Sequence, residues 1–481
     1  MNKKMIRYIL GKMLGVEALL LLLPAIVSWL YKEPSGMDFL ITAAILLLIY
    51  LICGTKKPKV FTIYGKEGML IVACAWLLWS FFGAIPFVIS GSIPNFVDAF
   101  FETISGFTTT GSTILTDIES LPKGILFWRS FTHWIGGMGV LVFVMVITAL
   151  DKNNSMYLMR AEVPGPEKDK LMPKATTTAR ILYAMYFLLT AIEVTCLLFG
   201  GMNLYDSLIH AFGTAGTGGF SNYGASVGYF NSAYIDGVIT VFMILFGINF
   251  SLFYFLMIGE VKAVWKNEEL RAYLGIILGS ALVITFNISG QFTSIGKAFR
   301  YAIFQVASII TTTGYATADY NNWPMLSQCI LLMLMVIGAC AASTGGGIKV
   351  SRLLMVGKCI KREIMRLVHP KNVSLIKVNG KKVNEEGIRT LSIYLMVYAC
   401  VLVLSILLVA IDNKDFATTF SSVLTCIGNV GPGIAEVGPS GNFSAFSPLS
   451  KLVLSFDMLA GRLELFPMLM LFTVSAWRRK F

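Results

Sequence analysis

The chain has 481 residues, of which 56% are hydrophobic and 14% are charged, and its formal net charge is +12. Soluble proteins carry about 25% charged residues, so this composition excludes a soluble globular protein and indicates an integral membrane protein. The hydrophobic stretches are long and continuous rather than alternating, which favours helices over a β-barrel. The predicted fold class is therefore an all-α integral membrane protein.

The positive charge lies at the ends of hydrophobic stretches, on every second connection, beginning with Lys3, Lys4, Lys56 and Lys57. This is the positive-inside pattern, which predicts that both termini are cytoplasmic. The same distribution argues against nucleic acid as the partner of this basic chain. The basic connections at 150–180 and 350–382 either contact a regulatory partner or lie against anionic membrane lipid.

In chain order, stretches long enough to cross a bilayer alternate with shorter ones. Crossings are predicted near 6–30, 37–54, 67–90, 124–149, 181–201, 233–258, 272–289, 388–411 and 449–476. A tenth, near 324–359, is interrupted by small residues at 338–347. Four segments too short to span are predicted to be re-entrant half-helices: 95–107, 204–214, 296–309 and 415–426.

Helix, half-helix, glycine turn and helix thus recur four times after a two-helix preface. The predicted division is 1–60 for the preface, then pore repeats at 61–150, 151–265, 266–385 (with a broken second helix) and 386–481. Such an arrangement surrounds a central pore.

Each half-helix is followed by a glycine turn. Taking Gly111, Gly219, Gly314 and Gly431 as anchors, the spacings are 108, 95 and 117 residues. Nine residues before the first three anchors stands a polar side chain: Glu102, His210 and Gln305. Six residues before each anchor the residue is small: Ser105, Gly213, Ser308 and Thr425. Of these positions, Glu102 and His210, with Asp98 and Asp206, either attract cations at an outer mouth or serve as helix caps and ion-pair partners.

Such turns can bind a cation. The C-terminal end of a half-helix is the negative end of its dipole, and glycine allows several carbonyls to face one point. Threonine hydroxyls add further oxygen ligands, and the absence of carboxylates from the turns argues against Ca²⁺ or Mg²⁺. The candidate ion-binding residues are Thr109, Thr110, Gly111, Thr217, Gly218, Gly219, Thr312, Thr313, Gly314, Asn429, Val430 and Gly431. The alternative is that the turns are structural bends.

Two further features lie at membrane depth. The small residues at 338–347 either pack closely against a neighbouring helix or form an irregular loop that lines a cavity. Arg462 lies in the middle of the last crossing, with Asp457 and Glu464 close by in sequence. It needs a partner or water there, so it either forms a local ion pair or faces the pore.

The repeat, with Phe107–Thr113 and Thr311–Thr317, strongly resembles the Trk/Ktr/HKT superfamily of potassium transporters over essentially the whole chain. The two extra N-terminal helices, 429–433 and 461–466 resemble its TrkH/TrkG branch. In plant relatives a serine at the first anchor accompanies Na⁺ transport, whereas this chain has Gly111. The second turn departs from a threonine run and leaves Gly218 and Gly219 as alternatives. Gly219 is preferred because Phe220 then matches Tyr315.

The resemblance implies K⁺ uptake, with Rb⁺ as an analogue, through a selectivity filter built from the four turns. It implies a bacterial cytoplasmic (inner) membrane location, a homodimer and a cytosolic nucleotide-binding regulatory subunit. Arg462 would be a pore charge below the filter. The intramembrane gate would consist of Ala341, Ala342, Ser343, Thr344, Gly345, Gly346, Gly347 and Lys349.

Other functions are less consistent with the sequence. The chain has no nucleotide-binding lysine loop and no intramembrane protease motif, so we expect no enzyme and no organic cofactor. The remaining alternative is an ion-coupled secondary carrier, a K⁺ or Na⁺ symporter with H⁺ or Na⁺.

Overall fold

The structure is a computed structural model that describes residues 2–58, 65–139, 175–370 and 375–477. Six described helices are long and apolar enough to cross a membrane. In the described part, the strands form one small hairpin, β1 (Lys377–Val378) with β2 (Lys381–Lys382). The predicted all-α integral membrane fold is confirmed. The predicted basic connection at 150–180 lies largely outside the described residues, as does the end of the crossing predicted at 124–149.

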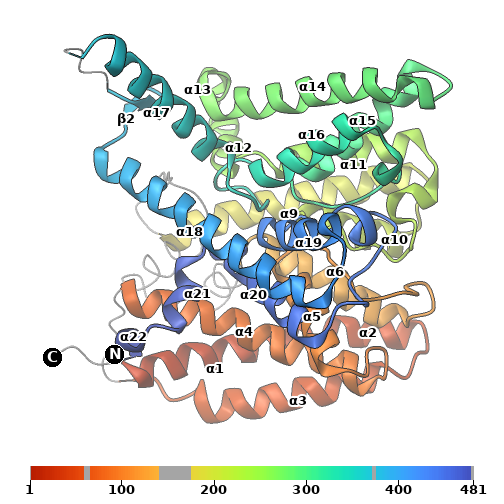
Figure 1. The fold of residues 1–481 in the computed structure, drawn as a ribbon. Helices are drawn as coiled ribbons and strands as arrows, with labels where there is room; N and C mark the ends of the chain where they lie inside the picture. The colour runs from red at the N-terminus through yellow and green to blue at the C-terminus, as the bar shows by residue number, and fades with distance from the viewer. Residues whose placement is uncertain (1, 59–64, 140–174, 371–374, 478–481) are drawn as a thin grey trace.

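The N-terminal preface consists of α1 (Lys3–Leu20), α2 (Leu22–Leu30) and α3 (Gly36–Cys53). These helices lie along one side of the molecule, with α14 (Glu268–Ile288) on the opposite side (Figure 1). Small residues bring α1 and α3 together, since a Cβ at Gly11 would lie 2.6 Å from the backbone nitrogen of Gly54. The preface therefore packs outside the repeats that follow.

The elements of the four repeats follow in order. The first has α4 (Gly65–Ile89), α5 (Phe96–Phe107) and α6 (Lys123–Gly137). The second has α9 (Ala175–Phe199), α10 (Leu204–Gly216), α11 (Ala233–Phe246), α12 (Phe250–Met257) and α13 (Val261–Lys266). The third has α14, α15 (Ile295–Ile310), α16 (Met325–Ile337) and α17 (Val350–Val368). The fourth has α18 (Glu385–Val409), α19 (Phe416–Gly428), α20 (Pro448–Arg462), α21 (Phe466–Leu471) and α22 (Val474–Trp477).

The half-helices α5, α10, α15 and α19 begin in the same way. A side-chain oxygen at each N-cap accepts a backbone N–H from the first turn: Asn95 from Val97, Asn203 from Asp206, Ser294 from Lys297 and Asp415 from Thr418. These caps fix the N-terminal end of each half-helix. The C-terminal ends of α5, α10 and α19 meet near the centre of the molecule (Figure 1).

Two predicted crossings are broken rather than continuous. The crossing near 233–258 bends by 93° between α11 and α12. There the backbone groups bond to another segment, with the Cys340 N–H donating to Gly247 O at 3.1 Å and the Phe250 N–H to Ala342 O at 3.1 Å. The crossing near 449–476 breaks after α20, where Glu464 and Leu465 have φ of 56° and 68°. The interrupted crossing at 324–359 is confirmed, since α16 and α17 flank a non-helical loop.

Candidate functional site

The four glycine turns share one backbone conformation. The anchor glycine and the residue two before it both have positive φ: Thr109 55° and Gly111 84°, Thr217 55° and Gly219 74°, Thr312 59° and Gly314 81°, Asn429 54° and Gly431 104°. Gly218 does not have positive φ, so Gly219 is the backbone equivalent of the other three glycines. The match between Phe220 and Tyr315 pointed to the same alignment.

The same hydrogen bond closes each turn. The N–H of the residue before the anchor donates to the carbonyl six before the anchor: Thr110 to Ser105 at 2.9 Å, Gly218 to Gly213 at 2.8 Å, Thr313 to Ser308 at 2.8 Å and Val430 to Thr425 at 2.9 Å. This bond folds the chain back over the last turn of the half-helix, as in helix C-caps. The small residues six before each anchor therefore lie where the turn folds back. At Gly213 even a Cβ would overlap the Tyr315 hydroxyl.

The four turns form a closed ring. Each anchor glycine lies against the carbonyl oxygen of the residue before the anchor of another turn: Gly111 against Gly218, Gly219 against Thr313, Gly314 against Val430 and Gly431 against Thr110. A Cβ at any anchor would crowd that oxygen to 2.7 Å or less. Glycine is thus required twice, for positive φ and for this close approach. The anchors also line an open cavity of about 760 Å³.

Side chains brace three of the turns. The hydroxyls of Thr108 and Thr110 lie 2.8 Å apart, and those of Thr311 and Thr313 lie 2.7 Å apart. In the fourth turn, Asn429 Nδ2 donates to Thr110 Oγ1 at 3.0 Å and so links the fourth turn to the first. These side chains are buried and keep their oxygen atoms near the ring.

The polar residues nine before the anchors fasten the segments that leave the turns. Glu102 accepts the Ile114 N–H at 2.9 Å, His210 Nε2 lies 3.1 Å from Ser221 Oγ, and Gln305 Nε2 donates to Ala318 O at 3.3 Å. The aspartates are also engaged with protein groups. Asp98 pairs with Lys451 at 2.6 Å, and Asp206 accepts hydrogen bonds from Asn203, Asn222 and Tyr223. The capping and pairing alternative therefore describes their contacts, with partners that the sequence did not single out.

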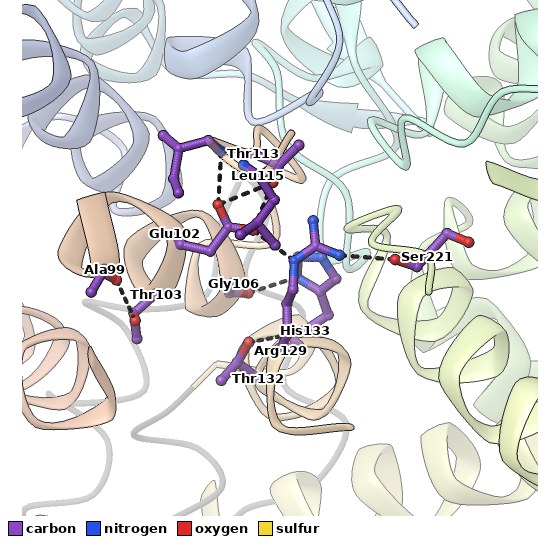
Figure 2. A network of polar contacts seen from close by, with 11 residues as sticks. Ala99, Glu102, Thr103, Gly106, Thr113, Leu115, Arg129, Thr132, His133 and Ser221 are labelled. Atoms are coloured by element: carbon purple, nitrogen blue, oxygen red, sulfur yellow. Dashed lines mark hydrogen bonds and ion pairs between the residues drawn. The ribbon is translucent and has the colours of Figure 1, made fainter. Parts of the chain in front are cut away.

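A buried ion pair joins α5 to α6. Arg129 Nε donates to Glu102 Oε1 at 2.6 Å, and a second guanidinium nitrogen donates to Ser221 O at 2.9 Å (Figure 2). The guanidinium also lies 3.5 Å from the centroid of the Phe220 ring. Sequence reasoning missed Arg129. Its signal was an arginine inside a predicted crossing, which requires a partner.

We expect Glu102→Gln to destabilise the protein by about 3–5 kcal/mol, because it leaves the buried charge of Arg129 without its counter-charge. Thermal unfolding of the purified protein in detergent measures this effect. The control is Glu436→Gln, which breaks an ion pair with Lys414 in which the Glu436 side chain is 54% exposed. That change should cost less than about 1 kcal/mol. Equal small losses in both variants would contradict the expected cost.

The loop at 338–347 lies against the third and fourth turns, on the side of the residues that precede the glycines. The Gly346 N–H donates to Thr312 Oγ1 at 2.6 Å, and the Gly347 N–H donates to Gly428 O at 2.9 Å. Farther along the loop, the Ala341 N–H donates to a carboxylate oxygen of Glu269 at 2.7 Å. Backbone hydrogen bonds of the loop therefore go to the turns and to neighbouring helices, as membrane depth requires.

The backbone of this loop departs from helical values. Ala342 and Lys349 have φ of 53° and 89°. The Lys349 side chain is buried and its ammonium group donates to Gly345 O. Positive φ at residues other than glycine stores conformational strain, which is common in switch segments.

Arg462 ties the loop to α6. Its guanidinium donates to Thr344 O at 2.6 Å, to Gly136 O at 2.5 Å and to Gly137 O at 2.8 Å. The two acidic residues considered as its partners have contacts of their own. Glu464 pairs with Arg352 at 2.8 Å. Asp457 accepts a hydrogen bond from Ser405 at 2.7 Å.

A comparison with protein families matches residues 36–478 to the family described as TrkH, cation transport protein. The chain belongs to the TrkH family. It is 36% identical over 487 residues to the Trk system potassium uptake protein TrkH of Escherichia coli K12, covering 99% of this chain and 100% of the relative. It is 34% identical over 484 residues to TrkG of the same strain, covering 99% of each.

The fold of the TrkH family is also found in a solved structure. The crystal structure of the potassium transporter TrkH from Vibrio parahaemolyticus matches with a TM-score of 0.89 and 34% sequence identity, covering 99% of this chain and 100% of that one. The chain is therefore a multi-span membrane protein of a transporter family, as the sequence predicted.

Proposed function

We propose that this protein takes up K⁺ across the bacterial cytoplasmic membrane through the ring of four glycine turns, which acts as its selectivity filter. The observation that carries the proposal is the set of contacts between each anchor glycine and a carbonyl of another turn. They bring four buried backbone segments of the same conformation to one place beside an open cavity. The names of the relatives, which are potassium uptake proteins, support K⁺ as the ion.

The chemistry of the ring suits a weakly hydrated monovalent cation. Backbone carbonyl and threonine hydroxyl oxygens replace the hydration shell of such an ion without binding it too tightly. Four half-helices end at these turns, and the negative ends of their dipoles favour a cation. The turns contain no carboxylate in the sequence, which is the ligand that Ca²⁺ sites use most.

The loop at 338–347 with Lys349 is the proposed gate, and Arg462 is the proposed pore charge. In support, the loop bonds directly to Thr312 and Gly428 of two turns. Arg462 in turn holds the loop through Thr344. A positive charge and a closed loop beside the filter would raise the barrier to a passing cation.

The family resemblance further supports a homodimer that works with a cytosolic, TrkA-like nucleotide-binding subunit, and termini on the cytoplasmic side. The helix α17 carries basic residues on the connection where such a subunit would bind: Arg352, Lys358, Lys361, Arg362 and Arg366.

Flux of Rb⁺ into liposomes that contain the purified protein tests the proposal. We expect K⁺ to compete with Rb⁺ far better than Na⁺ does. Gly111→Ser should lose this preference, because Gly111 has φ of 84° and lies against the Gly218 carbonyl. Flux with equal competition by Na⁺ and K⁺ in the unchanged protein would refute the selectivity filter. An absence of flux would be resolved by the deletion of 341–347, since a closed gate would open and a wrong assignment would stay silent.

A further inference from the structure

The second turn lacks the side-chain brace that the others have. In the first and third turns, the residues three and one before the anchor are threonines whose hydroxyls bond to each other. The equivalent residues in the second turn are Gly216 and Gly218. The hydroxyl of Thr217 between them bonds to the adjacent Gly216 carbonyl at 2.6 Å and so reaches no other element. Two glycines around one threonine leave this backbone the freest of the four turns.

His133 of α6 occupies the space that the missing side chains would need. A Cβ at Gly218 would overlap the imidazole ring, and a Cβ at Gly216 would overlap the backbone carbonyl of His133. The ring also stacks on Phe220, directly after the anchor glycine, with centroids 4.2 Å apart. The imidazole therefore touches the second turn both before and after Gly219.

The same ring bonds to the first half-helix. His133 Nδ1 lies 2.7 Å from Gly106 O, one turn before the first glycine turn (Figure 2). A carbonyl can only accept, so Nδ1 carries the hydrogen. Nε2 has no hydrogen-bond partner among the described residues, which is compatible with the neutral ring and would leave a donor of the charged ring unsatisfied. A neutral ring also adds no positive charge beside the cation path.

Arg129 completes the arrangement from one helical turn away. Its guanidinium lies on the Phe220 ring, and His133 stacks on the same ring, so both contacts come from one face of α6. The carbonyl that lies against Gly111 belongs to Gly218, next to the imidazole. The position of this one carbonyl in the ring thus depends on a side chain outside the four turns.

We propose that His133 is a positioning residue for the second filter turn, where it replaces the hydroxyl brace and sets the preference for K⁺ over Na⁺. The inference rests on the proposed function of the glycine ring. A residue that merely fills the core would affect the amount of folded protein and the total flux. A positioning residue also changes the ratio between the two ions, because the placement of the Gly218 carbonyl sets the fit to the ion.

The test measures competition of Na⁺ and K⁺ with Rb⁺ uptake into liposomes. We expect His133→Ala to lower the K⁺ over Na⁺ preference by about tenfold, about the worth of one buried hydrogen bond with its packing. His133→Asn keeps a donor toward Gly106 and should lose less, and it serves if the alanine variant does not fold. The matched control is Trp134→Phe, since Trp134 faces Tyr186 of α9 rather than the turns, with ring centroids 5.5 Å apart. Its preference should be unchanged.

A double variant sharpens the test. Gly218→Ala alone should abolish flux, because the added Cβ overlaps the imidazole. In the His133→Ala background the same change should be tolerated, which gives a strongly non-additive pair. Wild-type preference in both His133→Ala and His133→Asn, with additive effects at Gly218, would overturn the inference. If Gly111→Ser also leaves the preference unchanged, the proposed filter itself fails. If Gly111→Ser lowers it, the role of His133 alone is refuted.

Discussion

Replacing Gly314 by alanine is expected to abolish Rb⁺ and K⁺ flux, whereas replacing Gly91 by alanine should leave flux unchanged. Both glycines have positive φ, 81° at Gly314 and 72° at Gly91, so alanine carries a similar backbone strain of about 1–2 kcal/mol at each position. Their surroundings differ. A Cβ at Gly314 would overlap the Val430 carbonyl and lie 2.8 Å from Pro432 Cδ, while nothing lies within 4 Å of a Cβ at Gly91.

Flux into liposomes with equal amounts of each variant measures this prediction, and size-exclusion chromatography confirms that both are folded. Because the two variants share the strain, the difference between them isolates the overlap with the ring carbonyl. Undiminished flux in Gly314→Ala would contradict the ring as the ion path. An equal loss in Gly91→Ala would instead assign the effect to backbone strain.

Removing residues 341–347 should raise flux by about tenfold or more, equivalent to lowering the barrier by about 1.4 kcal/mol. The deletion removes the loop that bonds to Thr312 in the third turn, to Gly428 before the fourth and to Arg462. Arg462→Ala should act in the same direction, because it releases Thr344 and removes a positive charge from the cation path. Rb⁺ uptake without any added partner is the measurement.

The control for Arg462→Ala is Arg300→Ala. Arg300 pairs with Asp236 at 2.7 Å and has no bond to the 338–347 loop among the described contacts. Its loss should leave the flux rate unchanged. A decrease of flux in both the deletion and Arg462→Ala, in protein that still folds, would show that the loop supports conduction rather than closing it.

The membrane class, the half-helices and the spacing of the glycine turns were predictable from the sequence because their causes are local. A run of apolar residues of bilayer length, an N-cap such as Asn95 or Asn203, and a glycine at positive φ each act within a few residues. Repetition of the pattern then made the four turns recognisable as equivalents. The resemblance to a transporter family followed from the same residues, and the family match agrees with it.

Contacts between distant segments could be read from the tertiary structure alone. The choice of Gly219 over Gly218 as backbone equivalent depends on φ, which two adjacent glycines leave open in the sequence. The bend between α11 and α12 arises because Gly247 and Phe250 bond to a loop about ninety residues later in the chain. His133 and Arg129 gave no pattern in sequence, because the groups they contact lie on other elements.

The sequence by itself therefore determined the class of protein, the repeat and the residues that line the turns. The tertiary structure decided how the four turns meet, which side chains hold them and where the interrupted helix lies against them. The physical reason is that hydrophobicity and turn preference are properties of neighbouring residues. A close approach such as that of Gly111 to the Gly218 carbonyl depends on how separate helices pack.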